Sequence, residues 1–249
     1  ELVFAYIDEL SAASVAGHTD ELATSGRVRQ QYRERLGQAL LAGSPSATVE
    51  ALAARADWSP PPTLTAVLLP SARTRGALAL VDPGTLVVPG DLVDVQDMDV
   101  LLAPGSRQVL LRHLRGVAAV VGPTRTWPEA RTSFARAVRM NGVAPAQELV
   151  DTERHLTTLV LTADPEALAD LRAQALAPLA AVRAGTAERL AETLRSWLLH
   201  QGRREEVAAD LHVHPQTVRY RMTQLRDLYG DRLLKPEFVL QLTVALGAP

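Results

Sequence analysis

Apolar residues recur at helical spacing in the first part of the chain. The positions repeat at close to 3.6 residues before and after Gly26, at Val3, Ile7, Leu10, Tyr32, Leu36 and Leu40. The segment 43–46, Gly-Ser-Pro-Ser, ends this pattern because Gly, Pro and Ser favour turns. Residues 1–42 are therefore predicted to form a helical N-terminal element.

Short apolar runs dominate residues 43–148. Runs that end at Pro or Gly are typical of strands, and they occur at TLTAVLLP (63–70), GALALVDP (76–83), TLVVPGD (85–91), MDVLLAPG (98–105) and GVAAVVGP (116–123). Helical patterns follow at residues 106–115 and from Thr126, where Thr126 and Glu129 have the spacing of a capping box. The alternation of strands and helices predicts an α/β domain with a buried sheet.

No convincing strand pattern follows Glu148. Asp164 before Pro165 is an N-cap with proline at the first helical position, which predicts a helix as far as Leu176. A second apolar face predicts a helix over residues 186–200. The fold class is therefore expected to be α+β, with an all-α region over residues 149–249 after an α/β domain over residues 43–148.

Residues 203–230, RREEVAADLHVHPQTVRYRMTQLRDLYG, predict two helices joined by a tight turn. The short helix runs over 204–211, the turn over 212–214, and the longer helix begins at Pro215. Helices joined in this way cross steeply, as in a helix-turn-helix. One apolar seam is expected to hold the pair together, at Val207, Leu211, Val213, Val218, Met222 and Leu225.

This spacing alone leaves two interpretations open. An ordinary helical hairpin with an Arg-rich polar face has the same apolar pattern as a helix-turn-helix. The turn also has His212 at a place where many helix-turn-helix units have Gly.

The second helix has polar residues on the side opposite the seam. A rotation of about 100° per residue places Gln216, Tyr220 and Thr223 there, with Arg219 and Arg221 beside them. The recognition helix of a helix-turn-helix reads base edges with its N-terminal residues. Arg suits guanine and Gln suits adenine through paired hydrogen bonds, so these side chains are predicted to face DNA.

Other residues of the segment suit phosphate groups. Thr217 and free amides at the start of the second helix can bind a phosphate, and Arg203 and Arg204 precede it on the first helix. The chain has a net charge of −2, yet eight cations and five anions lie between Arg195 and Lys235. That segment therefore has a net charge of +3 and the rest of the chain −5, which favours a polyanion as the partner of this region.

The run LAETLRSWLLHQGRREEVAADLHVHPQTVRYRMTQLRDLYG, with LLKPEFVLQLTVALGA after it, resembles the C-terminal domain of the PucR/CdaR family of bacterial transcriptional regulators. The specific marks are Thr193-Leu194, AADLHVH, QTVRYRM over 216–222 and the closing helix at 242–246, within a core at 187–247. The preceding region, with GVAAVVGPTRTWPEA, is similar to the degenerate GGDEF-like domain found before that helix-turn-helix.

This resemblance implies a sequence-specific DNA-binding regulator of catabolic or secondary-metabolic genes. It assigns the DNA-facing role to Gln216, Thr217, Arg219, Tyr220 and Arg221. One helix-turn-helix covers only one half-site, so we expect a homodimer that binds promoter or operator DNA. The lack of Cys fits a cytoplasmic location. A small-molecule effector would bind an upstream domain, and a chain that begins with Glu1 rather than Met is expected to be part of a longer protein.

Catalytic chemistry has little support in the sequence. The chain has no Cys, which excludes thiol nucleophiles and Cys-based zinc sites, and no GGDEF string. The acids Asp94, Asp97 and Asp99 have the pattern of a solvated turn, and the pair His212 and His214 has no third metal ligand at suitable spacing. We expect no enzyme activity, metal, cofactor or membrane segment. The alternative function is an interaction module in which the helix-turn-helix only packs and does not read DNA.

Overall fold

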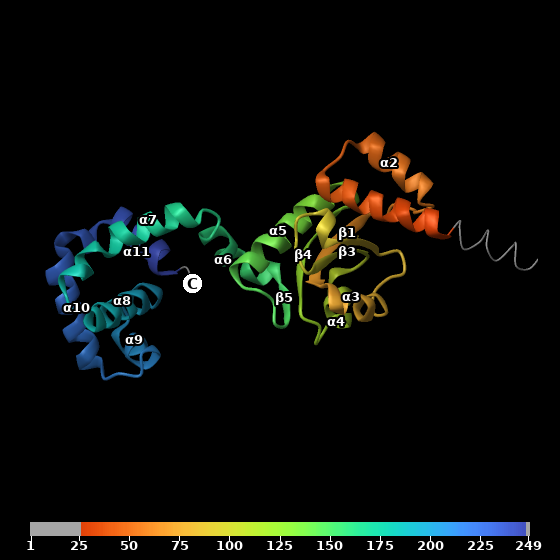
Figure 1. Ribbon diagram of the computed structural model, residues 1–249. Helices are drawn as coiled ribbons and strands as arrows, with labels where there is room; N and C mark the ends of the chain where they lie inside the picture. Colours follow the sequence, from red (N-terminus) through yellow and green to blue (C-terminus); the bar gives the residue numbers. More distant parts are fainter. Residues whose placement is uncertain (1–25, 248–249) are drawn as a thin grey trace, which may run out of the picture. The chain divides into compact units, whose positions relative to one another are not determined.

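The computed structural model describes residues 26–247, so the predicted helical positions Val3, Ile7 and Leu10 lie outside the described residues. The chain divides into two compact units with the boundary between His155 and Leu156 (Figure 1). Among the described residues, no helix is long and apolar enough to span a membrane.

The first unit contains a five-stranded sheet. Its strands are β1 (Thr63–Pro70), β2 (Leu86–Pro89), β3 (Met98–Pro104), β4 (Ala119–Thr126) and β5 (Leu149–Asp151). They lie in the order β2-β3-β1-β4-β5, and all neighbours are antiparallel except β4 and β5, which are parallel. Six consecutive residues of the central strand β1 are buried, as expected for a sheet covered on both faces.

Helices cover both faces of this sheet (Figure 1). α3 (Ser71–Leu78) and α4 (Arg107–His113) pack on one face, over a core that includes Val67, Leu101 and Val121. The helix over 26–42, α2 (Ser46–Arg55) and α5 (Ala130–Val143) lie on the other face. The helix over 26–42 approaches β2 so closely that a Cβ at Gly37 would overlap the Val88 side chain. Its apolar stripe is therefore part of the core of the first unit.

Four of the five predicted strands are confirmed, and the one over 76–83 is wrong. Residues 71–78 instead form α3, because the chain turns at Pro70 and crosses back over the sheet with Ala77 facing the core. The absence of a strand after Glu148 is also wrong. β5 has only three residues and exists through pairing with β4, so local alternation gives no signal for it.

The predicted capping box differs from the structure. Thr126 caps no backbone amide; its hydroxyl donates to the Glu129 carboxylate at 2.8 Å. With Pro128 in the first turn, the chain forms the 3-10 helix η2 (Trp127–Glu129) before α5 begins.

The second unit is helical throughout. Its elements are α6 (Leu156–Leu161), α7 (Pro165–Leu176), η4 (Ala177–Ala181), α8 (Ala184–Leu199), α9 (Arg204–Asp210), α10 (Pro215–Tyr229), η5 (Gly230–Leu234) and α11 (Pro236–Gly247). The predicted N-cap is confirmed, since the Asp164 carboxylate accepts from the Ala167 amide at 2.9 Å. The α+β fold class is confirmed, whereas the predicted divisions at 42/43 and 148/149 stay predictions.

Candidate nucleic-acid interface

The predicted seam between α9 and α10 is confirmed. Val207, Val218, Met222 and Leu225 are buried, and Leu211 and Val213 pack against the same core. Ala208, also buried, is the small residue that lets the two helices approach closely. The two helices therefore form a helix-turn-helix unit with one shared core.

The turn between the helices needs a left-handed residue, and His212 supplies it. Its φ is +51°, in the region that Gly adopts most readily. Backbone hydrogen bonds close the end of α9, from the His212 amide to the Ala209 carbonyl and from the Val213 amide to the Ala208 carbonyl. The turn thus forms without Gly, at the steric cost of a side chain in the left-handed region.

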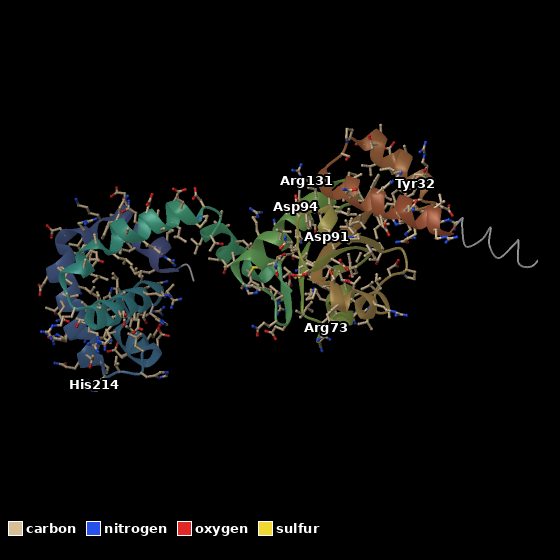
Figure 2. All side chains as sticks on the ribbon, in the orientation of Figure 1. Tyr32, Arg73, Asp91, Asp94, Arg131 and His214 are labelled. Carbon is tan, nitrogen blue, oxygen red and sulfur yellow. The ribbon has the colours of Figure 1, made fainter. Side chains whose placement is uncertain are left out.

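His214 caps the start of α10 (Figure 2). Its Nδ1 accepts a hydrogen bond from the Gln216 amide at 3.2 Å, and its carbonyl accepts from the Thr217 amide at 2.8 Å. The expectation of free amides at this helix start is therefore wrong for the amides of Gln216 and Thr217. The sequence signal for the cap was Pro215, which favours the first helical position and so places the cap one residue earlier.

The side of α10 opposite the seam is exposed. Gln216, Arg219, Tyr220 and Thr223 all lie on it, and Tyr220 is 64% exposed. The Tyr220 hydroxyl accepts from the Gln224 side-chain amide at 3.2 Å, which orients the ring along the helix. Arg219 has no side-chain hydrogen bond or ion pair among residues 26–247, so its guanidinium donors are available to a ligand.

Arg221 has different surroundings from the other predicted residues of α10. It is half-buried, and its Nη1 donates to the Thr193 hydroxyl on α8 at 3.2 Å. Thr193 is itself buried. The structure therefore places Arg221 at the junction of α8 and α10, apart from the exposed group on α10.

Arg203 and Arg204 also differ from each other. Arg203 forms an ion pair with Glu206 at 3.1 Å and donates to the His200 carbonyl. Arg204 is exposed and has no polar side-chain partner in the described part of the chain. The charge of Arg203 is thus partly neutralised by its own helix, whereas that of Arg204 is not.

A polar network that no sequence pattern indicated joins α8 to α9. The Ser196 hydroxyl donates to the Asp210 carboxylate at 2.6 Å. The His200 ring lies between two carboxylates, with Nδ1 3.4 Å from Glu206 Oε2 and Nε2 3.6 Å from Asp210 Oδ2. The hydrogen bond from Ser196, and then the nearby His200, lower the pKa of Asp210 below its usual value. These residues follow no periodic pattern, because the contact forms only when the two helices pack.

The residues considered for metal binding do not form a cluster. Within residues 26–247 no group of three or more His, Asp or Glu side chains could hold a metal ion. His214 is engaged in the cap described above, and Asp94 and Asp97 lie in a turn, each with φ of +57°.

Residues 190–248 match the PucR C-terminal helix-turn-helix domain. An uncharacterised protein of Mycobacterium tuberculosis is 32% identical over 145 residues, which cover 55% of this chain and 34% of that protein. An uncharacterised protein from the pkwA 5′ region of Thermomonospora curvata is 39% identical over 62 residues, which cover 25% of this chain and 34% of that protein. The match spans about a third of the length of these curated relatives.

Among solved structures, a regulator of polyketide synthase expression from Bifidobacterium adolescentis aligns with 18% identity and a TM-score of 0.41. The alignment covers 87% of this chain and 91% of that chain.

The match to the domain family falls on the same residues as the packed α8–α11 core. The chain therefore contains the C-terminal helix-turn-helix domain of the PucR family, a domain class that binds DNA.

Proposed function

We propose that this protein is a sequence-specific transcriptional regulator of the PucR/CdaR type, which inserts α10 into the major groove of duplex DNA. One observation carries the proposal. The polar face of α10 is exposed while the opposite face is buried in the seam, so the helix is held rigidly with its Gln and Arg side chains directed outward. Rigid presentation of this kind is what direct base readout needs.

Base reading is assigned to the four exposed residues of α10, which are Gln216, Arg219, Tyr220 and Thr223. Arg219 has guanidinium donors that no residue within 26–247 occupies, and they suit the O6 and N7 acceptors of guanine. Gln216 suits the N6 and N7 edge of adenine. Tyr220 and Thr223 lie on the same face and contribute hydroxyl and apolar contacts.

Positioning on the DNA is assigned to the residues around this group. Arg204, exposed and unpartnered in the described residues, is proposed to contact a phosphate, as are Thr217 and, more weakly, the Glu206-paired Arg203. Arg221 is proposed to act by holding α10 against α8 through Thr193. Its replacement should therefore change the presentation of α10 rather than remove one base contact.

The proposal also includes the oligomeric state, the target genes and the role of the first unit. A single helix-turn-helix covers one half-site, so a homodimer on two half-sites about 34 Å apart is proposed. The PucR resemblance supports control of catabolic or secondary-metabolic genes, a cytoplasmic location and an effector that binds an upstream domain. The first unit is proposed to be a GGDEF-like domain without catalytic activity.

The experiment compares two Arg variants with the wild-type protein on selected DNA. Fragments that bind the wild-type protein are first enriched from a random duplex library, and affinities are then measured at several salt concentrations. Arg219→Ala should lose about 1–3 kcal/mol on the selected site and relax the base preference there. Arg204→Ala should weaken binding evenly on selected and scrambled DNA and flatten the salt dependence.

Controls separate these effects from loss of the fold. Arg189→Ala removes an exposed Arg from α8 of the same unit, and its affinity should match wild type. Val218→Asp places a charge in the seam and should unfold the helix-turn-helix. If folded Arg219→Ala and Gln216→Ala proteins keep both the affinity and the base preference, α10 does not read DNA. The interaction-module function would then be the better one.

A further inference from the structure

We propose that the helix-turn-helix unit contains a binding site for a small amphipathic monoanion, an apolar body with one carboxylate or similar group. The site is formed by two adjoining cavities between α8, α10, η5 and α11. Their volumes are about 480 and 410 Å³, and they share Trp197, Met222 and Leu233 as lining residues. Each volume lies within the range of small-molecule sites.

The walls of the larger cavity are apolar. Leu194 and Met222 form its buried base, and Leu198, Leu233 and Val239 are its partly buried sides. These side chains belong to four helical elements, α8, α10, η5 and α11, which together line the cavity. An apolar body bound there would remove partly exposed Leu and Val surface from water, which is favourable.

One wall is the aromatic ring of Trp197, and Gly202 keeps the space beside it open. Gly202 has φ of +77°, and a Cβ at that position would lie 3.1 Å from the Trp197 ring. Both the backbone conformation and the space beside the ring therefore favour Gly at this position. A flat apolar ligand bound in the cavity would contact the Trp197 ring.

Three hydrogen-bond donors lie around the cavities. The Trp197 indole N–H, the Gln201 side-chain amide and the Arg226 guanidinium line the two cavities. Within residues 26–247 none of the three side chains forms a hydrogen bond or an ion pair. Donors of this kind, one of them a full positive charge, fit the oxygen atoms of an anionic group.

The charges limit the ligand to one negative charge. Asp231, on η5, lines the second cavity together with Arg226. Its carboxylate opposes a second negative charge on the ligand, so phosphomonoesters and dicarboxylates fit poorly. The observations favour a small molecule over a protein partner, because the charge lies at one end of an apolar recess of ligand size.

The test uses a matched pair of fluorescent probes on the full chain. 8-Anilinonaphthalene-1-sulfonate is an apolar monoanion, and N-phenyl-1-naphthylamine is its counterpart without the charged group. The wild-type protein should bind the sulfonate probe saturably and more tightly than the uncharged probe. Arg226→Gln should weaken the sulfonate probe about 5- to 10-fold and leave the uncharged probe unchanged, because only the charge contact is lost.

A second variant tests the cavity itself. Leu233→Trp adds a large side chain inside both cavities and should weaken both probes at least 10-fold, with folding checked by circular dichroism. Arg189→Gln, an exposed Arg of α8 outside the cavity lining, is the matched control and should bind both probes as wild type does.

Three results would overturn the proposal. One is equal affinity of wild type and Arg226→Gln for the sulfonate probe. Another is probe binding that a folded Leu233→Trp protein retains. The third is a change of sedimentation coefficient in Leu233→Trp without saturable probe binding in wild type, which would assign this groove to a second copy of the chain.

Discussion

Replacing Tyr229 by Phe should stabilise the second unit. Tyr229 ends α10 and is 3% exposed, and its hydroxyl is buried without a hydrogen-bond partner in the described residues. Desolvation of an unsatisfied polar group costs about 1–3 kcal/mol. Phe keeps the ring contact with Phe238, where the centroids are 5.8 Å apart. We therefore expect the free energy of unfolding to rise by about 1 kcal/mol at pH 7.

The pH dependence of stability should change as well. Burial raises the pKa of Tyr229 from 10.0 to about 12, while the positive charge of Arg232 opposes the shift. The unfolded chain therefore ionises this phenol first, so the free energy of unfolding is unaffected by this group below pH 10 and falls as the pH rises to about 12. The loss should approach about 2–3 kcal/mol. Tyr229→Phe should lack this component.

The assay is urea unfolding at pH 7, 10 and 11.5, with hydrogen exchange of α8–α11 to assign the transition to the second unit. Every other titratable group is common to wild type and Tyr229→Phe, so the difference in stability between the two proteins at each pH isolates the contribution of Tyr229. Tyr220→Phe is the control, since its exposed hydroxyl should give no gain in stability. A less stable Tyr229→Phe protein at pH 7 would refute the reasoning, because it would mean that the hydroxyl is satisfied in solution.

Three further substitutions test the turn, the α8–α9 network and the first unit. His214→Asp should raise the melting temperature, because Asp is a better N-cap, yet weaken DNA binding in titrations by adding a negative charge beside the phosphates. Ser196→Ala should raise the pKa of Asp210 in carboxyl NMR titrations. The stability from that depressed pKa is present above its unfolded value and lost in acid, so acid unfolding should begin at higher pH. Gly90→Ala should destabilise the first unit by more than about 2 kcal/mol in thermal melts, because its Cβ would overlap the Met98 and Val95 carbonyls.

Sequence patterns predicted most of the local structure. Helices with strong caps or clear apolar faces, such as α7 and α8, form close to their expected bounds. Both errors about strands arise because a strand depends on its partners in the sheet as well as on its own composition. β5 forms only by pairing with β4. The segment 76–83 has the composition of a strand, but its apolar residues lie at the end of α3 and in the turn after it, where they cover the sheet.

Helical periodicity within 28 residues was enough to predict two paired helices, with an apolar seam on one side and a polar face on the other. The tertiary structure decided what each polar side chain contacts. Arg221 and Arg219 are two residues apart, yet packing of α8 gives Arg221 a partner in Thr193 and leaves Arg219 exposed. Contacts between helices that are distant along the chain depend on their crossing geometry, which no local pattern encodes. The Ser196–Asp210 bond and the cavity beside Trp197 arise in the same way.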